Sequence, residues 1–235
     1  EYLFLNSGTD TFPILEAVER MMDEERSVPQ IILCIDETTA MFAAHGYYQT
    51  TGRAQAAKLH ERLEREGFRP THLYSSPLKR CAQTADIIAR SWLVDVSYWD
   101  DLKEYDVGIV SGMTWDEIAV RHPHIDRELE TSRQLAGVEG AESLADRRAR
   151  GQRVVDAVLG RHAEGDEGVI VTHGGILQHV LAALMGTDRT WGMSIHNTAV
   201  YEFDIDLERW GMDGEGLLST AFWRIERFND ASHLD

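Results

Sequence analysis

Residues 168–184 read GVIVTHGGILQHVLAAL, and this stretch decides the fold class. The apolar run that begins it has the length of a buried strand, and the run that ends it repeats apolar residues with a helical period. His173 and two glycines separate the two runs. In an open parallel sheet, a residue at the carboxyl end of a strand faces the crevice where ligands bind. The stretch therefore predicts an α/β protein with His173 at a ligand site.

The composition is that of a soluble globular protein. Of the 235 residues, 43% are hydrophobic and 27% are charged, and 40 acidic residues against 23 Lys and Arg give a formal charge of −17. This charge disfavours nucleic acid and anionic membranes as partners. Cys34 and Cys81 lie far apart in the sequence. With no apolar run of membrane length and no secretory segment, we expect a cytoplasmic protein.

Strand patterns alternate with helical patterns along most of the chain. This alternation predicts a three-layer α/β sandwich, in which helices cover both faces of a mostly parallel sheet. Two further strands are expected at the end of the chain, in AVYEFDI (199–205) and STAFWRIERF (219–228). Residues 121–142 are polar and lack a clear period, so we interpret them as a surface excursion that shapes substrate choice. We expect a single domain over residues 1–235.

Three polar residues follow strand patterns at positions suited to chemistry. YSSPLKRCAQT places Arg80 in the first turn of a helix, where a guanidinium and backbone N–H groups can hold one phosphate. DLKEYDVGIVSG places Glu104 in a loop punctuated by glycine. Taken singly, Arg80 is a common surface residue, Glu104 a common solvated carboxylate and His173 a common core histidine.

In their order, SSPLKRCAQTADII, LKEYDVGIVSGMTWDEI, EGAESLADRRARG and VIVTHGGILQHVL resemble the histidine phosphatase superfamily, the phosphoglycerate mutase-like family. The resemblance covers about residues 52–206.

This resemblance implies a phosphoric-monoester hydrolase or mutase that acts on a small phosphorylated substrate and requires no cofactor or metal. It assigns phosphate binding to Arg80, the role of the second active-site histidine to His173 and leaving-group protonation to Glu104. The adjacent positions are candidate substrate contacts: Ser76, Thr172 and Gly174.

The family's nucleophile belongs to an Arg-His-Gly motif on the first strand, and the sequence lacks this motif. The nearest strings are AHG at 44–46 and RHP at 121–123, and neither follows a suitable strand. We therefore expect impaired phosphoryl transfer. A noncatalytic domain that binds a phosphate ligand or a protein is the alternative.

Residues 2–53 have a different resemblance. YLFLNSGTDTFPILEAV and IILCIDETTAMFAAHGYYQTTGR are similar to the start of the pyrimidine-binding domain of thiamine diphosphate-dependent enzymes of the acetolactate synthase type. This resemblance implies that Glu37 contacts the cofactor. It makes a second alternative, a fragment that binds thiamine diphosphate and magnesium with a partner chain. The two resemblances meet near residues 52–56 and suggest a fused chain, with a phosphatase-like core at 54–235.

The strand IILCI (31–35) could also fill the vacant place of the phosphatase's first strand. Asp36 and Glu37 would then lie near the missing arginine and histidine and would repel a phosphate dianion. No His, Cys and Asp spacing along the chain is typical of a metal site. Eight other histidines share no catalytic motif and are interpreted as structural or surface residues: His45, His60, His72, His122, His124, His162, His179 and His196.

Overall fold

The structure is a computed structural model that describes residues 2–6, 30–34, 52–125, 137–190, 195–210 and 223–235. The chain separates into two compact units, Glu1–Gln55 and Ala56–Asp235. In the first unit, β1 (Tyr2–Asn6) and β2 (Gln30–Cys34) form a parallel pair. The boundary between the units falls inside the stretch where the two sequence resemblances meet.

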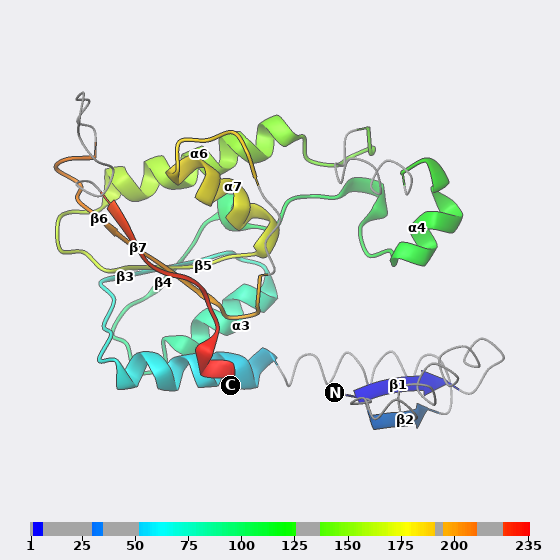
Figure 1. Ribbon diagram of the computed structural model, residues 1–235, viewed down its shortest axis with the longest axis horizontal. Helices are drawn as coiled ribbons and strands as arrows, with labels where there is room; N and C mark the ends of the chain where they lie inside the picture. The colour runs from blue at the N-terminus through cyan, green and yellow to red at the C-terminus, as the bar shows by residue number, and fades with distance from the viewer. Residues whose placement is uncertain (1, 7–29, 35–51, 126–136, 191–194, 211–222) are drawn as a thin grey trace. The chain divides into compact units, whose positions relative to one another are not determined.

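The second unit is built on a parallel sheet of three strands, in the order β4-β3-β5. Helices and an antiparallel pair of strands complete this unit (Figure 1). Its principal elements are β3 (His72–Ser75), α3 (Lys79–Ile88), β4 (Val96–Tyr98), α4 (Trp115–Arg121), α6 (Leu144–Arg161), β5 (Gly168–Val171), α7 (Gly174–Leu184), β6 (Val200–Ile205) and β7 (Trp223–Asp230). Residues 52–65 are also helical. The predicted α/β class is confirmed.

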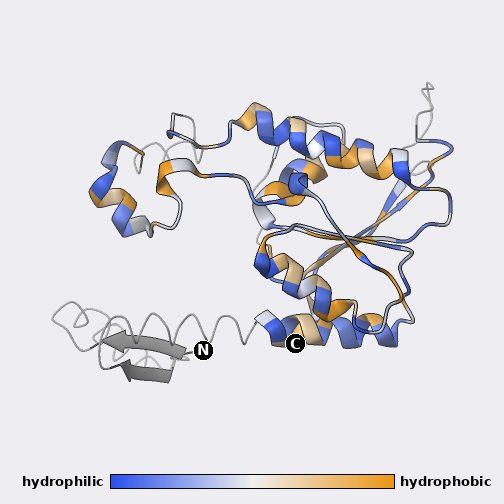
Figure 2. Ribbon diagram, turned by 180° about the vertical axis from the view of Figure 1, so that it is seen from behind, coloured by the Kyte–Doolittle hydropathy of each residue, from blue (hydrophilic) through white to orange (hydrophobic). Residues whose placement is uncertain are grey.

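Helices cover both faces of the sheet because neighbouring side chains of a strand point to opposite faces. On β3, Leu73 packs with Leu59 of the helix at 52–65 and with Ile88 of α3. The next residue, Tyr74, packs with Val154 of α6. Figure 1 shows α6 and α7 on one side of the sheet and α3 on the other. Figure 2 shows hydrophobic and hydrophilic residues interleaved along these helices, as expected for helices with one buried face.

Several helices begin where the sequence supplies a capping side chain. Thr114 and Glu117 form a reciprocal capping box at the start of α4, and the Ser143 side chain accepts a hydrogen bond from the backbone N–H of Asp146 in α6. Helices α6 and α7 approach closely at Gly151, where an added Cβ would lie 2.6 Å from the backbone of His179. This contact places the long helix α6 against α7.

The two predicted closing strands are present as β6 and β7, which pair antiparallel. Much of the excursion at 121–142 lies outside the described residues, as do Asp36 and Glu37. The proposed insertion of residues 31–35 into the phosphatase sheet concerns the relation between the two units and stays a prediction. Within the described ranges, no helix is both long and apolar enough to span a membrane.

Candidate active site

The carboxyl edge of the parallel sheet brings Arg80 and His173 together. His173 follows β5 and is the N-cap residue of α7, and Arg80 is the second residue of α3. Arg80 Nε donates a hydrogen bond to His173 Nδ1 at 2.9 Å. The two residues are 93 positions apart in the sequence. The predicted proximity of these motifs at one sheet edge is therefore present in the structure.

The contacts of His173 define its protonation state. Because Nδ1 accepts from Arg80, the ring proton lies on Nε2, which donates to Ser76 Oγ at 2.8 Å. His173 is buried at 6% exposure. Burial, followed by the positive charges of Arg80 and Arg150, lowers the pKa of His173 to about 4. His173 is therefore a neutral imidazole near neutral pH.

Ser76 is fully buried directly after β3. Its hydroxyl oxygen also accepts a hydrogen bond from the backbone N–H of Leu78 at 3.2 Å. In this arrangement the Ser76 hydroxyl orients the His173 ring. Its predicted contact with substrate stays a prediction.

Cys81 packs against the same histidine. Its Sγ lies 3.4 Å from His173 Nε2 and donates to the carbonyl oxygen of Thr172 at 3.3 Å. Burial raises the pKa of the Cys81 thiol to about 11. The protonated thiol is a packing partner of the imidazole and a poor nucleophile at neutral pH.

Glu104 lies at the N-terminus of α7, where it contacts Gly175, which is 71 positions away in the sequence. Its carboxylate accepts hydrogen bonds from the backbone N–H groups of Gly175 and Ile176 at 3.1 and 3.0 Å, and from Tyr105 N–H at 3.1 Å. A carboxylate at this end of a helix is stabilised by the helix dipole. Glu104 thus caps α7 in the structure, and its role as proton donor stays a prediction.

An ion pair between Arg150 and Glu142 supports the loop that carries Glu104. Arg150 of α6 pairs with both carboxylate oxygens of Glu142 and donates to the carbonyl oxygen of Lys103, the neighbour of Glu104. The guanidinium of Arg147, one turn earlier, lies over the Tyr105 ring at 4.7 Å from its centroid. These two arginines hold the loop that carries Glu104.

Two other predicted substrate contacts have structural partners. The Thr172 hydroxyl donates to the carbonyl oxygen of Leu102 at 2.8 Å, which ties the end of β5 to the same loop. An added Cβ on Gly174 would lie 3.3 Å from Ile195 Cδ1. Thr172 therefore acts on the loop through its side chain, and Gly174 allows close packing at the start of α7.

The absence of a substitute for the missing nucleophile stays a prediction. Among the described residues, no second histidine makes a hydrogen bond to Arg80 or His173. Within the RHP string, Arg121 ends α4 on the surface and lies 3.7 Å from Glu117. Glu37 and the AHG string lie outside the described residues, so the thiamine diphosphate alternative stays a prediction.

Comparison with known proteins identifies the family. Residues 49–215 match the histidine phosphatase superfamily (branch 1). The chain belongs to this superfamily. One curated relative, "Probable phosphoglycerate mutase GpmB" of Salmonella paratyphi B, is 26% identical over 187 residues, which are 78% of this chain and 81% of the relative.

Two solved structures share the fold. YhfR of Bacillus stearothermophilus superposes with a TM-score of 0.64 at 26% identity, over 78% of this chain and 84% of that one. A mycobacterial glucosyl-3-phosphoglycerate phosphatase with inorganic phosphate gives a TM-score of 0.59 at 22% identity, over 79% and 88% of the two chains. The superfamily fold therefore extends over most of this chain.

Sequence patterns do not identify the residues that hold this site in place. No motif marks Arg150 or Glu142, and the sequence shows Cys81 only as one of two cysteines, without its contact to His173. Arg150 and Glu142 are eight residues apart, a spacing that no local rule connects. The only signal for them in the sequence is that Arg150 and Glu142 carry opposite charges.

Proposed function

We propose that this chain binds a small phosphate monoester at the Arg80–His173 pair and turns it over slowly or not at all. The observation that carries the proposal is the 2.9 Å hydrogen bond from Arg80 Nε to the neutral His173 ring. This bond uses one edge of the guanidinium, and Arg80 is exposed. Its two terminal nitrogens are thus free to receive a phosphate from solvent.

The electrostatics support an anion at this position. The guanidinium is a fixed cation, and charge-assisted hydrogen bonds to phosphate oxygens are stronger than neutral ones. The backbone N–H groups at the start of α3 add positive potential on the same side. Because His173 is neutral and hydrogen-bonded to Ser76, it can donate or accept at the phosphate only after a local rearrangement.

The missing Arg-His-Gly motif supports the impairment. Phosphoryl transfer through a phosphohistidine needs a nucleophilic imidazole, and His173 has its Nδ1 occupied by Arg80 and its Nε2 occupied by Ser76. Of hydrolysis and mutase activity, we favour hydrolysis, on the resemblance of THGGILQHVL to the phosphatase branch. The names of the relatives, among them phosphoserine phosphatase and glucosyl-3-phosphoglycerate phosphatase, support a small phosphorylated metabolite as ligand.

The test combines binding and turnover in the purified full chain. Inorganic phosphate and an aryl phosphate are titrated by calorimetry, and release of the aryl alcohol is followed in the presence of a chelator. Arg80→Gln is expected to weaken binding by about tenfold or more, as for loss of one charge-assisted contact. Arg90→Gln is the matched control, because Arg90 is an exposed arginine just beyond the end of α3.

Saturable binding that depends on Arg80, with turnover no faster than in His173→Ala, would support the proposal. Efficient turnover that both substitutions abolish would overturn the impairment and show that another group supplies the nucleophile. Absence of binding, or equal binding by Arg80→Gln and Arg90→Gln, would refute the assignment of the site.

A further inference from the structure

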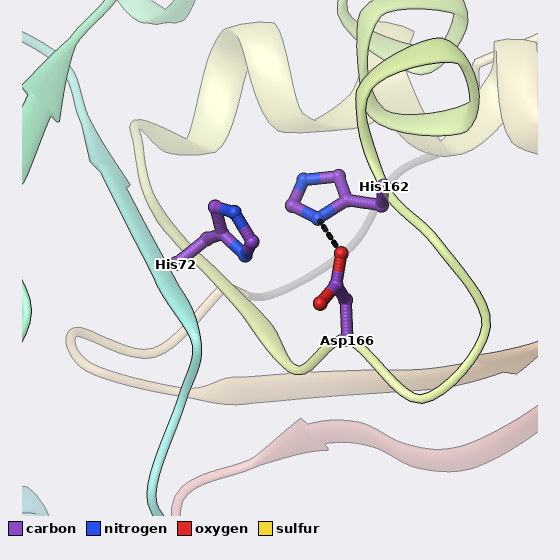
Figure 3. A group of neighbouring side chains, drawn as sticks. All are labelled: His72, His162 and Asp166. Carbon is purple, nitrogen blue, oxygen red and sulfur yellow. Dashed lines mark ion pairs between the residues drawn. The ribbon is translucent and has the colours of Figure 1, made fainter.

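Three potential metal ligands converge at the amino edge of the parallel sheet, away from the Arg80–His173 pair. His72 is the first residue of β3, His162 is the C-cap residue of α6, and Asp166 lies in the turn before β5. Each offers one ligand atom, and the three atoms lie within 4.8 Å of one another. Figure 3 shows the two rings and the carboxylate turned toward a common point.

His162 has no protein partner that satisfies its ring. Its side chain is only 7% exposed, and neither ring nitrogen makes a hydrogen bond to any residue that the structure describes. Nδ1 instead lies 3.4 Å from Asp166 Oδ2. Two ligands of a tetrahedral zinc ion, each about 2.0–2.1 Å from the metal, are roughly 3.4 Å apart. A buried imidazole without a hydrogen bond is costly, and an ion at this point would remove the cost.

His72 is oriented with one nitrogen available. Its Nδ1 lies 2.8 Å from Thr71 Oγ1, which also accepts from the backbone N–H of Glu167 at 3.0 Å and donates to the Glu167 carbonyl oxygen at 3.2 Å. All three contacts are satisfied together when His72 carries its proton on Nδ1. The lone pair on Nε2 is then free for a metal, and Thr71 acts as the outer partner that typically fixes a ligating histidine.

Asp166 is held as a charged ligand that solvent can reach. Its Oδ2 accepts a hydrogen bond from the backbone N–H of Ala163 at 2.9 Å, which holds the carboxylate in place. Its side chain is 24% exposed, so an ion can enter from this side. The carboxyl end of α6 adds negative potential that favours a cation.

We propose that His72, His162 and Asp166 bind a divalent transition-metal ion, with zinc as the best fit. Two imidazole nitrogens and one carboxylate form a donor set that zinc accepts, and they leave a fourth position for water. The three ligand atoms lie within 4.8 Å of one another, so a small movement of the side chains closes the set to the spacing of roughly 3.4 Å expected around a tetrahedral zinc ion. Hard ions such as Mg²⁺ and Ca²⁺ fit less well because they prefer all-oxygen ligands.

Aromatic packing alone does not account for this arrangement. The His72 and His162 rings meet edge to face at 4.5 Å between centroids, and both also contact Tyr74. Packing explains why the rings lie together. It does not explain why a buried imidazole keeps both nitrogens without a hydrogen bond.

The site would act on folding stability. His72 and Ser76 are four residues apart on an extended strand, roughly 13 Å, so the metal would lie too far from the phosphate site to take part in its chemistry. It would instead fasten the start of β3, the end of α6 and the turn before β5 to one another. The inference does not depend on the proposed function.

The test uses the tag-free full chain after treatment with a chelator. Zn²⁺ is titrated by calorimetry near neutral pH, and thermal unfolding is measured with and without the ion. We expect one ion per chain and a rise in Tm of roughly 5–10 °C when the ion is in hundredfold excess over its Kd. His72→Gln and Asp166→Asn are expected to weaken binding at least about tenfold, comparable to the loss of an outer partner.

His122→Gln is the matched control, since His122 lies beside another histidine, His124, and away from this cluster. It should leave affinity, stoichiometry and the Tm shift unchanged. In the presence of chelator, the Tm of each variant must lie within a few degrees of the Tm of the unsubstituted chain. His72→Gln should meet this condition even if a substitution of the buried His162 does not.

Several results would overturn the proposal. These are a Tm that zinc leaves unchanged, a stoichiometry of zero, and binding that survives both His72→Gln and Asp166→Asn. Cobalt provides an independent check, because thiolate charge-transfer bands in its visible spectrum would place the ion at a cysteine instead.

Discussion

Replacement of Gly175 by alanine tests the geometry at the start of α7. A Cβ at this position would lie 2.4 Å from Glu104 Oε1 and 2.2 Å from Tyr105 Cε1, far inside van der Waals contact. Neither neighbour can move without loss, because Glu104 caps α7 and Tyr105 lies under the guanidinium of Arg147. The substitution must therefore displace the cap or push the ring aside.

The expected cost follows from these contacts. Overpacking costs about 1–3 kcal/mol, loss of the Glu104 cap costs about 1 kcal/mol, and the better helix propensity of alanine returns up to about 1 kcal/mol. The net destabilisation is about 2 kcal/mol. For a protein of this size, it corresponds to a decrease in Tm of about 4–8 °C.

The assay is thermal unfolding followed by circular dichroism, with Gly160→Ala as the control. Gly160 lies in the last turn of α6, and nothing lies within 4 Å of an added Cβ there. This substitution should stabilise the protein by about 0.5–1 kcal/mol through helix propensity alone. If Gly175→Ala were as stable as Gly160→Ala, the contact between α7 and the Glu104 loop would be wrong.

Three further predictions concern buried groups. Burial lowers the pKa of His173 to about 4, so the unfolded state binds more protons than the folded state between about pH 6.5 and pH 4. The free energy of unfolding should therefore fall by about 3 kcal/mol as the pH decreases through this range. In urea titrations, His173→Gln should remove that decrease. Burial raises the pKa of Cys81 to about 11, so peptide mapping after alkylation near neutral pH should find it unmodified until the chain is unfolded, and rapid labelling of the folded protein would contradict its burial. Arg150→Gln leaves the Glu142 carboxylate without its buried partner and should lower the free energy of unfolding in urea by about 3–5 kcal/mol. The control Arg153→Gln removes an exposed ion pair and should lower it by about 1 kcal/mol or less. Equal decreases would contradict the burial of the Arg150–Glu142 pair.

Local pattern was sufficient for the elements that position the site. The run from Gly168 to Leu184 predicted β5, the histidine at its carboxyl end and α7, because apolar periodicity and a Gly-punctuated turn are properties of neighbouring residues. The strands β6 and β7 were predicted for the same reason. The joint order of four motifs then indicated the superfamily, which comparison with known proteins confirms.

The partners of the site residues could not be predicted in this way. Sequence assigned Glu104 as a proton donor, and the fold places its carboxylate on the N–H groups of α7. Sequence offered Ser76 and Thr172 as substrate contacts, and the fold gives their hydroxyls to His173 and Leu102. Hydrogen-bond partners depend on distances between segments, and periodicity contains no such distances.

The sequence by itself thus determined the fold class, the superfamily and the placement of Arg80 and His173 at one sheet edge, since parallel strands must present their carboxyl ends together. Only the tertiary structure decided which nitrogen of His173 carries the proton. It alone also brought His72 to within reach of His162 and Asp166, 90 residues later in the chain. Side chains become buried, and distant segments come into contact, only when the chain packs. The hydrogen bonds and desolvation that select these contacts therefore cannot be inferred from neighbouring residues.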